Sequence, residues 1–193
     1  VVTILPAFIE PQEVVVSLIG NVFWNPVESP SDINSIFSSV SQYINSYGTS
    51  TFESSFLYPE FALGLKALDP GLIGDTLTAY LEVTVPQDTV SDTIFLRNTL
   101  STPNGIPGTV VETPNGFTTR LDDGTFRVVR IIDDGFGLLK MYDFGDFSFI
   151  KNVGSVDYRR GRIQLNGVFP TDPDGFTLRV RPLSNTVIAR GNI

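Results

Sequence analysis

Carboxylate pairs are the side chains of this sequence whose type and spacing could do chemistry. Asp122-Asp123-Gly124 and Asp133-Asp134-Gly135 each place two carboxylates before a glycine, and residues 171–175 read Thr-Asp-Pro-Asp-Gly. Paired carboxylates can bind a cation or hydrolyse a glycosidic bond. Asp before Gly is also ordinary turn chemistry, and residues 171–175 lack the further oxygen ligands and the closing Glu of a calcium loop. We therefore interpret all three segments as turns.

The sequence contains no histidine and no cysteine, which limits the catalytic groups available to it. Histidine general bases, thiolate nucleophiles, disulfides and the usual zinc ligand sets are excluded. A serine nucleophile would need Lys66, Lys140 or Lys151 as its base, and we assign that role to none of them. We expect no catalytic residue, no cofactor and no metal, and hence a protein that is not an enzyme.

Composition indicates a folded chain of one large domain or two small ones. The chain has 193 residues, 41% of them apolar, with 15 Phe and 6 Tyr, which is enough for a substantial core. No apolar run reaches the roughly 20 residues of a membrane-spanning helix, so we expect no membrane insertion. The start, VVTILPAFIEP, has neither an initiator Met nor the charged region of a signal peptide. We expect the chain to be part of a longer one.

The net charge of −8 is concentrated in the first half of the chain. Residues 1–90 hold one basic side chain and ten acidic ones, whereas residues 91–193 hold twelve basic and eleven acidic. Nucleic-acid binding needs clustered Lys and Arg, so this distribution argues against nucleic acid as a partner. Two interpretations of the acidic half stay open: a solvated surface, or electrostatic matching between subunits.

The first half begins with the pattern of a strand followed by a helix. Residues 13–24 are rich in β-branched and aromatic side chains and fit one long strand. An amphipathic helix is predicted over 30–47, with Ser29 as N-cap, Pro30 at its first position and Gly48 ending it. Its apolar stripe consists of Ile33, Ile36, Phe37, Val40, Tyr43, Ile44 and Tyr47.

A second helix and a second strand complete this unit. The helix fits residues 59–68, and residues 76–85 alternate between apolar and polar side chains, as a half-buried strand does. The order strand, helix, helix, strand predicts a small α/β unit over residues 1–88. A right-handed crossover predicts that its two strands are parallel neighbours or near neighbours.

Short strands dominate the second half, where we expect a β-rich domain over residues 89–193. Strands fit residues 117–121, 125–132 and 137–142, and a hairpin is predicted over 153–169. Residues 176–182 fit a last strand, expected at a sheet edge because Pro182 closes it. The predicted class is therefore α+β, with antiparallel strands following the α/β unit.

Arginines gather at the predicted hairpin tip and on the last strand: Arg159, Arg160, Arg162, Arg179 and Arg181. They fit a solvated turn and an alternating polar face. They also fit an interface in which guanidinium groups bind carboxylates of a neighbouring subunit.

Four segments resemble, in order, the T4-like phage baseplate wedge subunit, the product of gene six. They are FIEPQEVVVSLIGNVFWNP (8–26), FESSFLYPEFALGLKALDPGLIGDTLTAYLEV (52–83), VGSVDYRRGRIQLNGVF (153–169) and LRVRPLSNTVIARGNI (178–193). Together they extend the resemblance over most of residues 8–193. The aromatic segment 142–149 has no counterpart in the family pattern, and the family's large N-terminal portion is not in this sequence.

The resemblance implies a structural subunit of the tail baseplate of the virion, assembled in the host cytoplasm. Such subunits associate with one another and with other wedge and hub proteins, joining wedges into a ring around the central hub. The expected interface residues are Phe52, Phe56, Tyr58, Phe61, Arg159 and Arg160.

Two other functions stay open at this point, one of them a glycan-cleaving enzyme whose turnover would disappear when one Asp is replaced. A β-rich tail-fibre or receptor-binding module could bind host-surface glycan through the aromatics of YDFGDFSF (142–149) and the acidic turns.

Overall fold

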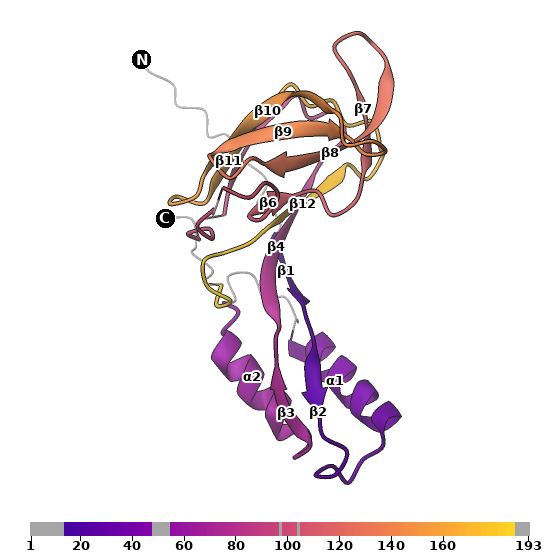
Figure 1. Cartoon of the computed structure of the whole chain (residues 1–193), viewed down its shortest axis with the longest axis vertical. Coiled ribbons are helices and arrows are strands. Elements are labelled where there is room, and N and C mark those ends of the chain that lie inside the picture. The colour runs from indigo at the N-terminus through magenta and orange to yellow at the C-terminus, as the bar shows by residue number, and fades with distance from the viewer. Residues whose placement is uncertain (1–13, 48–54, 97, 104, 188–193) are drawn as a thin grey trace, which may run out of the picture.

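The computed structural model describes residues 14–47, 55–96, 98–103 and 105–187. These residues form an elongated molecule with two lobes, a sheet lobe and a helical lobe (Figure 1). β1 (Val14–Ile19) runs from the sheet lobe toward the helices, and β4 (Thr78–Val85) runs back beside it into the sheet lobe (Figure 1). The α+β class predicted from the sequence is confirmed.

The helical lobe consists of two helices on a short two-stranded sheet. Its elements are β2 (Val22–Trp24), α1 (Ile33–Tyr47), α2 (Tyr58–Ala67) and β3 (Leu72–Asp75). β2 and β3 pair antiparallel and extend the β1–β4 ribbon beyond the main sheet (Figure 1). The long strand predicted over 13–24 is therefore two strands, which separate at Gly20.

The start of α1 differs from the prediction. Asp32 is the N-cap, because its Oδ1 accepts hydrogen bonds from the backbone N–H groups of Asn34 (2.8 Å) and Ser35 (3.0 Å). The N–H and hydroxyl of Ser35, together with the N–H of Asn34, lower the pKa of the Asp32 carboxyl. Ser29, the predicted cap, instead bonds with Ser31 in the preceding loop.

The predicted parallel pairing in the first half is wrong. β1 pairs antiparallel with β4, with Val16 opposite Leu81. Two parallel strands need a crossover that carries the chain back to the end of the sheet where the first strand began. Here α1 and α2 remain beside β2 and β3, so the chain turns back through β3 into β4 (Figure 1).

The sheet lobe is built from short antiparallel strands. They are β5 (Ser91–Phe95), β6 (Val111–Glu112), β7 (Phe117–Arg120), β8 (Phe126–Asp133), β9 (Leu138–Asp143), β10 (Phe149–Asp157), β11 (Arg162–Asn166) and β12 (Phe176–Val180). With β1 and β4 they form one curled sheet in the order β1-β4-β12-β6-β8-β9-β10-β11-β5, and β7 pairs with β8.

The position of β12 also differs from the prediction. Pro182 follows this strand, which led us to expect an edge, but β12 lies between β4 and β6. Proline removes a donor only at its own position, and β12 ends at Val180 before it. The sheet therefore continues from β4 into β12, across the division that the sequence predicted near residue 88.

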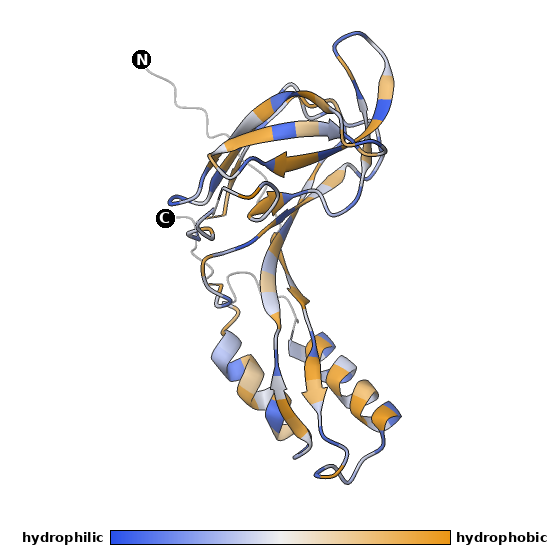
Figure 2. Ribbon diagram, viewed as in Figure 1, coloured by the Kyte–Doolittle hydropathy of each residue, from blue (hydrophilic) through white to orange (hydrophobic). Residues whose placement is uncertain are grey.

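Two hydrophobic cores follow from this layout. Ala79, Leu81, Val83 and Val85 of β4 are fully buried, which confirms the predicted alternation, and the last three belong to the large core of the sheet lobe. The helical lobe has a much smaller core built around Phe61, Leu65 and Leu77. Figure 2 shows that hydrophobic residues also cover much of α1, which this small core does not bury completely.

Candidate interaction surfaces

The acidic turns serve the fold, as the sequence analysis predicts. Asp123 accepts hydrogen bonds from the N–H (2.9 Å) and hydroxyl (2.7 Å) of Thr125. Asp172 accepts one from the N–H of Thr118 at 2.8 Å and so ties residues 171–175 to β7. Among the described residues, no group of three or more acidic side chains is placed to hold a metal ion.

Asp133 has a structural role that the sequence pattern did not distinguish. Its carboxylate is fully buried, and Oδ1 accepts the N–H groups of Val110 (3.2 Å) and Val111 (2.9 Å). Oδ2 accepts the N–H of Gly135 (3.2 Å) and the hydroxyl of Tyr158 (3.0 Å). Burial and the Asp133 charge raise the pKa of the Tyr158 phenol, so this hydroxyl remains a donor well above neutral pH.

A Ser-x-x-Lys spacing, overlooked in the sequence analysis, occurs at Ser148–Lys151. Lys151 lies in β10, and its Nζ bonds the carboxylate of Asp122 at 2.8 Å. Ser148 precedes the strand, so the helical turn that brings Ser-x-x-Lys side chains together is missing here. The contacts of Lys151 are those of a structural ion pair.

The aromatic anchors predicted between residues 52 and 61 have different positions. Phe61 is only 1% exposed and forms the core of the helical lobe, so its prediction as a surface anchor is not supported. Phe56 and Tyr58 are partly buried and lie with their ring centroids 5.5 and 6.4 Å from that of Phe61. Phe52 lies outside the described residues. This segment therefore builds the core of the helical lobe.

Tyr58 and Tyr43 complete that core with polar contacts. The Tyr58 hydroxyl donates a hydrogen bond to the carboxylate of Asp75, and burial together with this carboxylate raises the pKa of Tyr58 to about 12. The Tyr43 hydroxyl donates to the carbonyl oxygen of Phe61 at 3.0 Å and so fixes α1 against α2.

The largest difference from the predicted site is a row of exposed apolar residues on α1. Ile36, Val40, Tyr43 and Tyr47 face the helical core or are partly buried beside it. Three apolar side chains lie on the adjacent flank of the helix and face solvent: Ile33 (61% exposed), Phe37 (74%) and Ile44 (38%). We call these three residues the α1 strip.

The sequence contained the residues of the α1 strip but not their exposure. All three belong to the stripe predicted for helix 30–47, and a stripe of that width is normal for a helix that packs on a core. Exposure depends on how many elements cover the helix. In the described part of the chain, α2 is the only helix beside α1, which leaves one flank uncovered.

The predicted arginine cluster is divided between two settings. Arg179 lies in the sheet between Glu82 (2.9 Å) and Glu112 (3.7 Å), where it stabilises the β4–β12–β6 pairing. Arg159 and Arg160 are exposed in the predicted turn between β10 and β11, which the structure confirms. Arg160 also pairs loosely with Asp157 (Nε–Oδ2 3.8 Å), and the side chains of both arginines are exposed to a partner.

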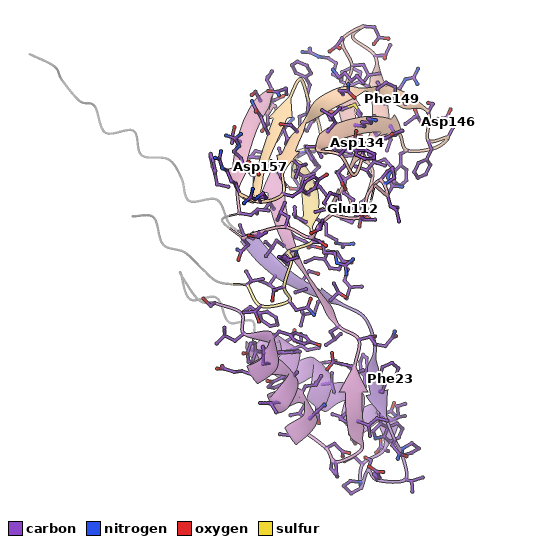
Figure 3. All side chains as sticks on the ribbon, turned by 60° about the vertical axis from the view of Figure 1, so that its left-hand side comes forward. Phe23, Glu112, Asp134, Asp146, Phe149 and Asp157 are labelled. Atoms are coloured by element: carbon purple, nitrogen blue, oxygen red, sulfur yellow. The ribbon has the colours of Figure 1, made fainter. Side chains whose placement is uncertain are left out.

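The aromatic segment 142–149 forms an exposed turn between β9 and β10. The guanidinium of Arg130 lies 5.7 Å from the ring centre of Phe144 and 4.7 Å from that of Phe147. Tyr142 and Phe149 meet across the two strands at 5.9 Å. Figure 3 shows the end of the sheet lobe, labelled by Asp146 and Phe149, to which this turn belongs.

Comparison with known proteins does not assign the chain to a family. No protein-family model matches it, and no curated protein is similar to it. Neither described helix is long and apolar enough to span a membrane.

Proposed function

We propose that this chain is a structural, non-enzymatic subunit of a contractile phage-tail baseplate that self-associates to join wedges into a ring around the hub. The observation that carries self-association is the α1 strip, where Ile33, Phe37 and Ile44 present apolar surface along one helix flank. A helix flank of this kind fits burial against another protein. The baseplate role, with wedge and hub proteins as further partners, rests on the sequence resemblance.

The first test measures the molar mass of the chain by light scattering over a concentration series. The wild-type chain is expected to gain mass with concentration. A Phe37→Ser/Ile44→Ser variant is expected to bind at least tenfold more weakly, because removal of two exposed apolar anchors costs binding energy and leaves the core intact. Leu63→Ser, which changes an apolar residue of α2 that is 71% exposed, is the matched control.

The results separate the possibilities. Equal weakening by Leu63→Ser would show that general surface polarity, not the α1 strip, controls association. A wild-type chain that stays monomeric at every concentration would contradict self-association.

Glycan binding is a second candidate, favoured by the exposed rings of Phe144 and Phe147 beside Arg130. Aromatic faces flanked by polar side chains can support a sugar ring. Binding to a glycan array that disappears in Phe144→Ser/Phe147→Ser would favour this function, and an array without signal would contradict it.

A further inference from the structure

One end of the sheet lobe combines positive charge with exposed apolar side chains. Arg159 and Arg160 lie in the β10–β11 turn, and Arg162 begins β11 opposite Phe95 at the end of β5. Phe95 is 59% exposed, and Leu138 at the start of β9 is 43% exposed. We call these five residues the arginine face.

Strand register places the apolar members of the arginine face on the same side of the sheet. Arg162 of β11 lies opposite Phe95 of β5 on one side and opposite Asp157 of β10 on the other. Ser155 precedes Asp157 by two residues on β10 and lies opposite Leu138 of β9. Residues directly opposite each other, and residues two apart on one strand, point to the same side. Phe95 therefore lies beside Arg162 and Asp157 lies on its other side, while Leu138 is on the same face one strand further along the sheet, with Arg159 and Arg160 at the rim.

The opposite combination occurs where α1 begins. Asp32, directly before Ile33 of the α1 strip, is exposed there, as are Phe37 one turn into the helix and Glu28 in the loop that precedes it. We call these four residues the acidic end of α1. Over the described residues of 14–77, Lys66 is the one basic side chain against five acidic ones. Apolar anchors are thus flanked by negative charge.

We propose that the arginine face binds the acidic end of α1 of a second copy of this chain. The inference deepens the proposed self-association and rests on it. Both surfaces have the anatomy of an interface, with apolar residues beside charged ones, and their charges are opposite. Pairing of either surface with itself would bring like charges together, which disfavours that alternative.

The two surfaces cannot satisfy each other within one chain in this structure. The arginine face belongs to the sheet lobe, where Asp157 marks the hairpin in Figure 3, and α1 belongs to the helical lobe, on the side of Phe23. A second copy lying antiparallel beside the first forms the contact twice, once at each end. Such a two-fold arrangement closes at two copies, so this contact would join two wedges, and contacts with the other wedge and hub proteins would complete the proposed ring.

Reversal of one charge on each surface tests this contact. Arg159→Glu and Glu28→Lys are each expected to raise the dimer dissociation constant about tenfold, because like charges then face each other in both contacts. An equimolar mixture of the two variants is expected to recover dimers, since each contact of the mixed dimer again joins opposite charges. Asp32 is left unchanged because it caps α1.

Arg120→Glu is the matched control, because it reverses an exposed charge on β7 rather than at the hairpin. Sedimentation at low salt and at about 0.5 M salt gives the dissociation constants, and circular dichroism verifies the fold of each variant. Weakening by salt and by the two surface variants, recovery in the mixture and a limit of two copies would support the proposal.

Three other results would overturn it in distinguishable ways. If the wild-type chain self-associates and neither Arg159→Glu nor Glu28→Lys raises the dissociation constant, this contact is ruled out and the proposed function still stands. A mixture that grows beyond two copies would overturn the two-fold arrangement. A wild-type chain that remains monomeric would contradict both the contact and self-association.

Discussion

At the scale of single residues, two sequence motifs of the same form have opposite environments. Asp122 and Asp133 each open an Asp-Asp-Gly turn. Asp122 is largely exposed and pairs with Lys151, whereas Asp133 is buried and accepts four hydrogen bonds. The same local chemistry makes a turn in both places, and the packing around it decides whether the carboxylate also holds distant segments together.

Because Asp133 is buried and Asp122 is exposed, replacement by alanine should lower the free energy of unfolding by different amounts at the two positions. Asp133→Ala should lower the free energy of unfolding by about 3 kcal/mol or more, because buried N–H donors lose their acceptor. Asp122→Ala, the matched control, should change it by less than about 1 kcal/mol, because its ion pair is solvent-exposed. Denaturant unfolding measures both values. Similar costs would show that the Asp133 network contributes little beyond a turn.

At the scale of the secondary-structure elements, Gly64 sets how closely α1 approaches α2. A Cβ at this position would collide with the hydroxyl of Tyr43, which reaches across to the carbonyl oxygen of Phe61. The glycine is thus required by a contact between helices, although it lies inside α2, where glycine is unfavourable by about 1 kcal/mol relative to alanine.

Gly64→Ala should therefore destabilise the chain even though it improves helix propensity, by about 1–3 kcal/mol for an overpacked contact. In a Tyr43→Phe background, which removes the colliding hydroxyl, the same substitution should cost less. Thermal unfolding of the two single variants and the double variant measures this coupling. Additive effects would show that Tyr43 and Gly64 do not determine the approach of the helices.

The sequence predicted elements better than their arrangement, for reasons visible in particular segments. Local sequence patterns placed β4 and α2 to within a few residues. Whether β1 joins β4 parallel or antiparallel, and whether β12 is central, depends on contacts distant in sequence. The same limit applied to the site: Phe61, an expected interface residue, is buried, and the sequence did not show that Phe37 of the predicted helix stripe is exposed.

At the scale of the whole molecule, the lobes differ in how much apolar surface they bury. The sheet lobe has an extensive core, whereas the helical lobe buries Phe61, Leu65 and Leu77 with partly buried neighbours around them. Regions with few buried contacts open at lower free energy than the rest of a protein. The lobes are joined through β1 and β4 and through an antiparallel bridge between Phe56 and Val187, and the helical lobe is expected to open while most of the sheet persists (Figure 1).

Trp24 makes this inference measurable, because the only tryptophan of the sequence lies in β2 of the helical lobe. Its fluorescence reports that lobe, whereas the backbone amide NMR signals of β8 and β9, which lie in the middle of the main sheet, report the sheet lobe. Phe61→Ala should destabilise the helical lobe by about 3–5 kcal/mol and shift the fluorescence transition to lower temperature without an equal shift of the sheet signal.

Leu178→Ala, in the core of β12, should shift both signals because the β1–β4 ribbon depends on the sheet. Equal shifts of both signals by Phe61→Ala would mean that the lobes unfold as one cooperative unit, in which case the exposed flank of α1 belongs to a surface as rigid as the sheet itself.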